Sequence, residues 1–245
     1  MTADPVSAGH VGRLAGLYRY PVKSLLGETL DQVAIDERGL ARDRLWSVRG
    51  GDGKLGSGKS TRRFRKMDGL LMLAASYPAD GDGPPVVELP DGQRARADEP
   101  AASATVSAHV GRPVTLGRES DVSHFDEGPV HLVTTASIGR LEQEVGSTVD
   151  VRRLRCNLLV DTGEATGFVE DDWVGRRLQV GDAVVLEVVS PMPRCVMLDL
   201  PQRDLPAGGG LLRALTRVND GDLGVLATVV RSGTVRRDDP VRLTS

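Results

Sequence analysis

Short runs of β-branched and aliphatic residues, separated at close intervals by glycine or proline, dominate the chain. The runs that favour β-strands lie at residues 14–20, 45–48, 86–89, 130–133, 158–161, 184–190 and 225–231. Segments 134–146 and 211–218 instead carry apolar residues at helical spacing, with Thr134 or Thr135 suited to begin the first helix and Gly146 to end it. Such spacing is typical of a sandwich or barrel, so we expect a mainly β (α+β) fold with a few short helices.

The composition is that of an ordinary globular protein. The 245 residues are 40% hydrophobic and 27% charged, and the net charge of −3 does not favour nucleic acid. No signal peptide pattern opens the chain, and no apolar stretch approaches the roughly 18 residues that span a bilayer. Two cysteines without a secretion signal argue against a disulfide framework. We expect a cytoplasmic protein with no nucleic-acid partner and no membrane span.

Residues 53–60 match the phosphate-binding P-loop pattern G-x-x-x-x-G-K-[ST]. A true P-loop follows a buried strand and begins a helix, but residues 44–52 are not a continuous apolar run and residues 61–66 have no apolar helical face. We therefore interpret the segment as part of a β-hairpin with its turn at 50–53, and keep nucleotide binding as the less favoured alternative.

The segment that ends at Cys195 is the main candidate for metal chemistry. The strand at 184–190 runs into Pro191 and Pro193, which fix φ, so we expect the chain to leave the sheet in a rigid turn. Arg194 beside Cys195 favours the thiolate, and a thiolate is a soft metal ligand. A buried, inert cysteine is the alternative on composition alone.

Other candidate ligands are weaker. Residues 151–157 concentrate three arginines, which suit phosphate binding but also describe a solvated basic rim. The four histidines have no ligand spacing, and the two cysteines are far apart in sequence. The chain therefore does not predict a zinc site, which needs three or four such ligands.

Six motifs follow one another along more than 200 residues. They are Y-P-V-K-S at 20–24, G-L-A-R-D-R-L-W at 39–46, R-L-R-C-N-L-L-V at 153–160, E-D-D-W-V-G-R-R-L at 170–178 with V-G at 180–181, P-M-P-R-C at 191–195, and G-T-V at 233–235 with D-P-V at 239–241. In this order they resemble the MOSC family, the molybdenum cofactor sulfurase C-terminal domains. The match is to longer members with an N-terminal MOSC β-barrel region, such as the mitochondrial amidoxime-reducing component and its bacterial relatives.

The resemblance implies an N-terminal MOSC β-barrel region at residues 10–120, a barrel-like MOSC domain at 121–245, and the molybdenum cofactor (Mo-molybdopterin) at their junction. It implies that Cys195 ligates molybdenum and is the catalytic residue. The other implied cofactor-binding residues are Lys23, Ser24, Arg44, Arg155, Asn157 and Arg194. Cys156 stands where the family usually has proline, and we expect this second thiol to add redox sensitivity.

The same resemblance implies an oxidoreductase that reduces small N-hydroxylated substrates, such as amidoximes or hydroxylamines. Two cysteines are too few for the four thiolates of an iron–sulfur cluster, so we expect separate electron-transfer proteins of the flavin reductase, ferredoxin or cytochrome type. The alternative is a non-redox carrier that delivers the molybdenum cofactor or sulfur elsewhere. Pyridoxal phosphate binding is a further association implied only for the family as a whole.

Overall fold

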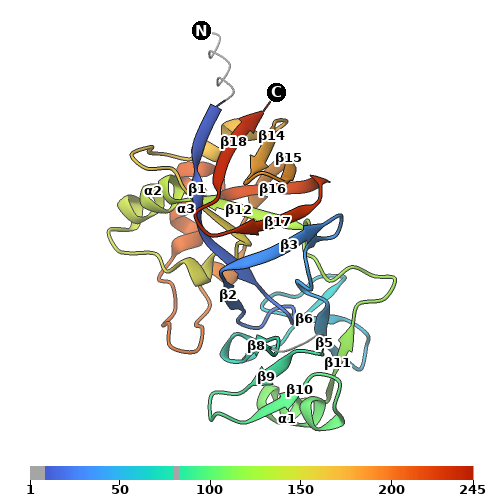
Figure 1. Ribbon diagram of the computed structural model, residues 1–245. Helices are drawn as coiled ribbons and strands as arrows, with labels where there is room; N and C mark the ends of the chain where they lie inside the picture. The colour runs from blue at the N-terminus through green and yellow to red at the C-terminus, as the bar shows by residue number, and fades with distance from the viewer. Residues whose placement is uncertain (1–8, 80–82, 245) are drawn as a thin grey trace.

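A computed structural model of the protein describes residues 9–79 and 83–244, and places a β-barrel above a smaller, mostly β region (Figure 1). Seven of the described strands close the barrel in the order β13–β12–β16–β15–β14–β18–β1 and back to β13. They are β1 (Gly9–Arg19), β12 (Val130–Thr134), β13 (Leu158–Asp161), β14 (Arg177–Val180), β15 (Val184–Pro193), β16 (Asp222–Arg231) and β18 (Pro240–Thr244). β12 and β13 pair in parallel, and the other neighbours in the barrel are antiparallel.

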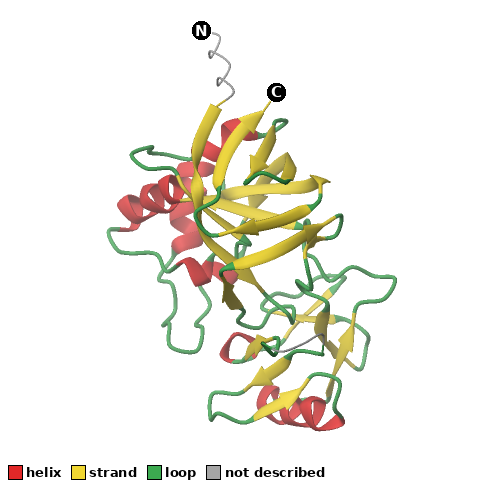
Figure 2. Ribbon diagram, in the orientation of Figure 1, coloured by secondary structure: helices red, strands yellow, loops and turns green. Residues whose placement is uncertain are grey.

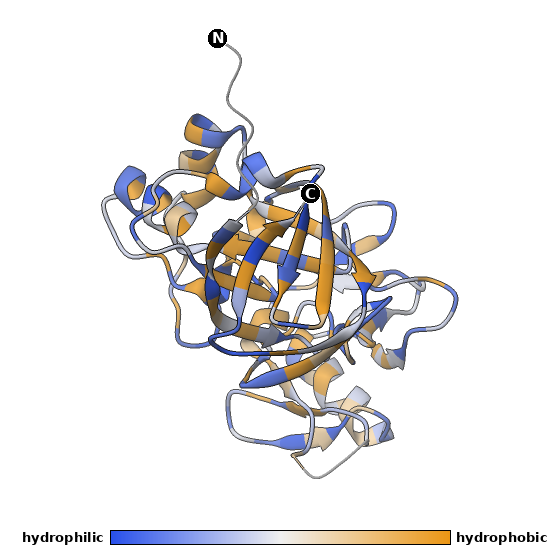
Figure 3. Ribbon diagram, turned by 45° about the horizontal axis from the view of Figure 1, so that its top comes forward, coloured by the Kyte–Doolittle hydropathy of each residue, from blue (hydrophilic) through white to orange (hydrophobic). Residues whose placement is uncertain are grey.

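The barrel closes because its strands alternate inward and outward side chains. Along β15, Val184, Leu186 and Val188 are fully buried, while Glu187 between them is exposed. This two-residue period lets one face of each strand fill the barrel interior. Figure 3 shows the same alternation as hydrophobic and hydrophilic segments along the barrel strands.

The first residues of the chain complete the barrel that the later ones form. β1 pairs with β13 and β18 and also carries β2 (Glu28–Leu30) beside it. A separate three-stranded sheet also combines strands from both ends of the chain. It consists of β17 (Gly233–Arg236), β3 (Gln32–Asp36) and β4 (Gly39–Leu40). The predicted division of the chain at residue 120 stays a prediction, but elements from both sides of it share these sheets.

Two predicted helices lie against the outside of the barrel (Figure 2). They are α2 (Thr135–Val145) and α3 (Leu211–Asn219). The Thr134 hydroxyl accepts a hydrogen bond from the Ser137 N–H at 3.1 Å, and Gly146 ends α2 with a φ of 71°. Thr134 therefore caps the N-terminus of α2 and Gly146 caps its C-terminus, as threonine and glycine commonly do. The helices pack over a second buried cluster that includes Leu141 and Leu215.

The remaining strands form two small sheets around a core of their own. One sheet is β11 (Val114–Arg118), β5 (Trp46–Gly50), β6 (Leu55–Ser57) and β7 (Phe64–Lys66), and the other is β10 (Arg94–Arg96), β9 (Val86–Glu88) and β8 (Ala74–Ser76). The helix α1 (Pro100–Val110) also lies here, and short 3-10 turns occur at η1 (Leu70–Met72), η2 (Val151–Arg153), η3 (Val169–Trp173) and η4 (Val196–Leu198).

The predicted hairpin is confirmed in place of the P-loop. β5 and β6 are antiparallel, with Arg49 opposite Leu55, and the Gly53 N–H donates to the Gly50 carbonyl at 2.9 Å. The chain then continues into β7, which pairs with β6 in parallel, so no helix follows the glycines. A P-loop needs a helix N-terminus there to receive phosphate.

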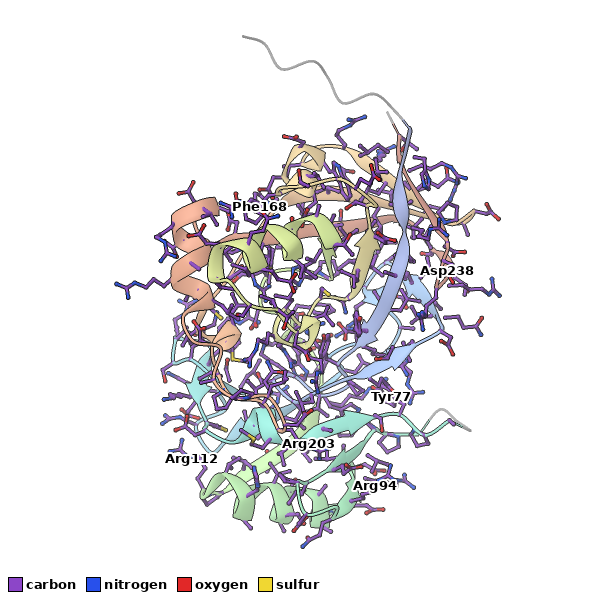
Figure 4. The ribbon with its side chains drawn as sticks, turned by 90° about the vertical axis from the view of Figure 1, so that its left-hand side faces the viewer. Tyr77, Arg94, Arg112, Phe168, Arg203 and Asp238 are labelled. Carbon is purple, nitrogen blue, oxygen red and sulfur yellow. The ribbon has the colours of Figure 1, made fainter. Side chains whose placement is uncertain are left out.

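The long loop after η4 connects the two regions on the left-hand side of Figure 1. Arg203, which follows η4, donates to Glu88 Oε1 at 3.0 Å and to the Leu89 carbonyl at 3.1 Å. Figure 4 shows Arg203 beside the lower sheets. Within the described residues, no helix has both the length and the apolar character needed to cross a membrane.

Candidate functional site

A pocket of about 720 Å³, counting its open mouth, lies between the barrel and the lower region. All seven residues that the motifs predict for the site line it. The lining is Lys23, Ser24, Arg44, Lys59, Phe125, Asp126, Glu127, Gly128, His131, Leu154, Arg155, Asn157, Met192, Pro193, Arg194, Cys195, Met197 and Leu226. Segments more than 200 positions apart in the sequence, from Lys23 to Leu226, therefore form one concave site, which is the usual form of a small-molecule or cofactor site.

Cys195 lies at the end of β15, where the strand gives way to η4. The Arg194 N–H donates to the Gly221 carbonyl at 2.9 Å, which holds the chain beside β16, and the Cys195 side chain is partly exposed in the pocket. The expectation that the prolines end the strand was wrong. β15 extends through Pro193, because register shifts around Pro191 and Pro193 accommodate residues that cannot donate to the ladder.

Three pocket residues have left-handed backbone conformations. φ is 66° at Ser24, 51° at Arg44 and 53° at Arg155. Residues other than glycine seldom adopt this region, and such strain gathers at binding and catalytic sites. Hydrogen bonds hold these turns: the Arg44 N–H donates to the Tyr20 carbonyl, and the Ser24 hydroxyl donates to the Gly56 carbonyl.

Arg44 and Arg155 both lie over the ring of Tyr20, with guanidinium carbons 4.7 and 4.4 Å from its centroid. Arg44 also pairs with the buried Asp43. Arg155 donates to the Leu25 carbonyl at 2.8 Å, and burial lowers its pKa to about 10. Two cations held this close favour an anionic ligand, since burying them without one is costly.

Lys23 is almost completely buried and pairs with Asp126 at 2.5 Å. Burial lowers the pKa of Lys23 to about 8, although Asp126 acts in the opposite direction. Burial alone would raise the pKa of Asp126, but Lys23 holds it below its usual value. The pair is therefore ionised at neutral pH.

Asn157 lies on the pocket wall, but its side chain is fully engaged by the protein. Its amide nitrogen donates to the Tyr18 carbonyl at 3.2 Å and to Asp43 Oδ2 at 3.1 Å. Its oxygen accepts from the His131 N–H at 3.2 Å. An amide offers two N–H donors, so a bond from Asn157 to a cofactor would replace one of these bonds.

Two buried polar atoms in the pocket have no partner within the described part of the chain: His131 Nδ1 and Arg194 Nε. His131 Nε2 lies 3.2 Å from the Leu223 carbonyl, and this contact favours the tautomer with the proton on Nε2 and an acceptor at Nδ1. Burial lowers the pKa of His131 well below its usual value, which keeps the ring neutral. A ligand with both a donor and an acceptor would satisfy the pair, and a pterin edge has both.

Cys156 does not support the expected redox sensitivity. Its side chain is fully buried in the cluster beneath the helices, and burial raises its thiol pKa to about 12. A neutral, inaccessible thiol is a poor nucleophile, because the thiolate is the reactive form. Burial therefore argues against a redox role for Cys156, and Cys195 is the more accessible of the two cysteines.

Sequence reasoning missed Lys59, Asp126 and His131 as pocket residues. Lys59 belongs to the glycine-rich hairpin, whose basic character was visible, but only the fold brings that hairpin to the pocket. Asp126 comes from the connection between β11 and β12. No group of three His, Cys, Asp or Glu side chains that could hold a metal on its own occurs among the described residues.

Family comparisons agree with this architecture. The MOSC domain matches residues 114–242, more than half of the chain, and the MOSC N-terminal beta barrel domain matches residues 11–98. No curated protein sequence matches the chain.

Solved structures resemble the fold at low sequence identity. One is APC1665, the YUAD protein from Bacillus subtilis, with a TM-score of 0.50 and 13% identity over 95% of this chain and 94% of that one. YiiM from Geobacillus stearothermophilus has a TM-score of 0.38 and 14% identity, covering 48% of this chain and 54% of its own. The two domain models match in order along the sequence, so that a MOSC domain follows a MOSC N-terminal beta barrel domain in this chain. The chain therefore belongs to the MOSC family.

Proposed function

We propose that the pocket binds the molybdenum cofactor, with Cys195 as the protein's sulfur ligand to the metal. The observation that carries the proposal is the convergence of Cys195 with five lysine, serine and arginine side chains in one pocket: Lys23, Ser24, Arg44, Arg155 and Arg194. MOSC domains are associated with this cofactor as a family. The pterin and its phosphate are polar and anionic, which suits a wall of lysine, arginine and serine.

The chain's own residues have distinct roles in this proposal. Cys195 provides one soft thiolate at the open side of the pocket. Arg44 and Arg155 provide positive charge that their stacking on Tyr20 holds in place. Arg194 Nε and His131 Nδ1 provide the unpaired donor and acceptor for the ligand's polar edge. When bound, the cofactor supplies the redox chemistry, and the protein supplies binding and orientation.

The reaction we propose is the reduction of small N-hydroxylated compounds, such as amidoximes or hydroxylamines. Separate flavin, iron–sulfur or haem proteins would supply the electrons, because two cysteines cannot hold a four-thiolate cluster. The family-level association with pyridoxal phosphate stays a prediction.

The first test is the content of molybdenum and pterin per chain after expression in a host that makes the cofactor. Wild type should carry both in near-stoichiometric amounts, and Cys195→Ser should lose the metal. Cys156→Ala is the matched control, since it removes a thiol that lies outside the pocket lining and should keep the metal. Retention of metal in Cys195→Ser would refute the ligand assignment.

Turnover is tested separately with an amidoxime and a reconstituted donor chain. Steady reduction by wild type, lost in Cys195→Ser, supports the reductase. A fully loaded protein that shows no turnover with any donor would favour a cofactor carrier instead.

A further inference from the structure

Lys59 and Asp126 have no place in the cofactor motifs, yet both line the pocket beside Lys23. Both lysines contact the Phe64 ring: the Lys23 and Lys59 ammonium nitrogens lie 4.6 and 5.5 Å from its centroid. An aromatic ring attracts cations, and both lysines lower the pKa of Asp126, so both charges act on the same carboxylate. Arg44 adds a third positive charge to the same pocket.

The hairpin places Lys59 through Gly58. A Cβ on Gly58 would lie 2.3 Å from the Met197 sulfur and 2.4 Å from a Leu200 methyl carbon, so this turn packs directly against side chains of the loop that follows Cys195. The Ser24 hydroxyl donates to the Gly56 carbonyl at 3.0 Å and fixes the other side of the turn. The glycine-rich segment is thus built against the pocket, although it is not a P-loop.

Asp126 is the one carboxylate that forms an ion pair with Lys23 among the described residues, and the two partners are unevenly buried. The Asp126 side chain is 39% exposed, whereas that of Lys23 is 3% exposed. Lys23 is therefore held inside the pocket, whereas Asp126 lies at its exposed edge, in the connection between β11 and β12. A carboxylate at that position neutralises the buried charge of Lys23, as a bound anionic ligand would.

We propose that Lys23 and Lys59 form a subsite for a phosphoryl group, and that Asp126 is the counter-ion that occupies it until the ligand arrives. This deepens the proposed function, because it concerns the same pocket. A bound phosphoryl group takes over the contact with Lys23, and Asp126 moves toward solvent. The ligand's apparent affinity is therefore reduced by the fraction of chains in which Asp126 is paired.

The test is calorimetric titration of cofactor-free protein with inorganic phosphate and with phenyl phosphate at pH 6.5, where Lys23 is protonated. Asp126→Asn should bind phosphate about tenfold more tightly than wild type, if the pair is closed in about nine chains of ten. Glu127→Gln is the charge-matched control, because Glu127 also lines the pocket but no ion pair joins it to Lys23. Its effect should be clearly smaller.

Lys59→Ala should weaken phosphate binding in both the wild-type and Asp126→Asn backgrounds. Lys54→Ala is its control, since Lys54 lies in the same hairpin but its ammonium donates to the Thr61 carbonyl outside the pocket. No binding in any variant, equal effects of Asp126→Asn and Glu127→Gln, or unchanged binding in Lys59→Ala would each overturn the proposal.

The two phosphate probes separate the sources of the ligand. Tighter binding of phenyl phosphate favours a phosphate monoester such as that of the pterin, and tighter binding of inorganic phosphate favours the free ion. If the protein binds phosphate but never loads molybdenum or pterin, the proposed function is refuted while the phosphoryl subsite is still supported.

Discussion

Replacing Asn157 with alanine tests whether this residue holds the cofactor or holds the pocket wall. The side chain is 1% exposed and makes three hydrogen bonds, to the Tyr18 carbonyl, Asp43 and the His131 N–H. Its loss removes three buried hydrogen bonds, at about 1 kcal/mol each. We expect a loss of about 3 kcal/mol in the free energy of unfolding.

In a chain of this size, about 3 kcal/mol corresponds to a fall of about 6–12 °C in the melting temperature. The assay is thermal unfolding of cofactor-free and cofactor-loaded protein. Because the amide is already engaged by the protein, the fall should be equal in both forms. A direct ligand would lose more in the loaded form, since binding to the native state adds stability.

Asn219→Ala is the matched control for this prediction. Asn219 is only partly buried and donates to Asp171 and to the Asp222 carbonyl, both at 2.9 Å. It should cost about 1 kcal/mol. If Asn157→Ala were no more destabilising than Asn219→Ala, the assignment of Asn157 as a positioning residue would be refuted.

Three further predictions concern thiol access, pH and backbone conformation. A thiol reagent at pH 8 should label one cysteine in native protein, Cys195, and two in denaturant, because Cys156 is buried and its pKa is raised to about 12. The pKa of Lys23 is about 8 in the folded protein and near 10.5 in the unfolded chain, so above pH 8 the unfolded chain binds more protons. The free energy of unfolding should therefore rise from pH 8 to 9 through Lys23. Denaturant titrations should show that this rise is absent in Lys23→Met. Gly224→Ala should cost about 3 kcal/mol in the same assay, since φ is 79° and a Cβ would lie 2.4 Å from the Leu132 carbonyl oxygen of β12. Gly139→Ala, with open space around it, should instead gain about 0.5–1 kcal/mol.

Each of these predictions has a contrary result. Labelling of both cysteines in native protein would show that the buried thiol is accessible. An identical pH dependence in wild type and Lys23→Met would show that the lysine does not titrate in that range. A stable Gly224→Ala protein would show that the two strands can separate without cost.

Local pattern predicted seven of the 18 strands and two of the three α-helices that the structure describes. The strand predicted at residues 158–161 is β13 (Leu158–Asp161), and the helix with Thr134 and Gly146 at its ends is α2. α1 (Pro100–Val110) was missed, because its alanines, serines and threonine give no apolar stripe and only Ala102 and Val106 are buried. Helical periodicity predicts a helix only when one face packs on a core.

For the site, the motifs predicted which residue types would meet but not how each is used. Cys195 and the arginines line one pocket, as expected from the order of their motifs. The engagement of Asn157 by its neighbours could not be predicted, because it depends on Asp43 from another strand connection. His131 gave no signal, since every residue of β12 is buried and the strand shows no alternation.

Local sequence was enough for seven of the described strands, the two amphipathic helices, the hairpin at residues 50–53 and the chemistry of the donors, because these depend on neighbours along the chain. Only the tertiary structure decided that Gly9–Arg19 closes a barrel with Leu158–Asp161 and Pro240–Thr244. It also decided that the basic hairpin and Asp126 meet Lys23 at the pocket. Such contacts join segments distant in sequence, and their formation depends on how the whole core packs, which no local pattern encodes.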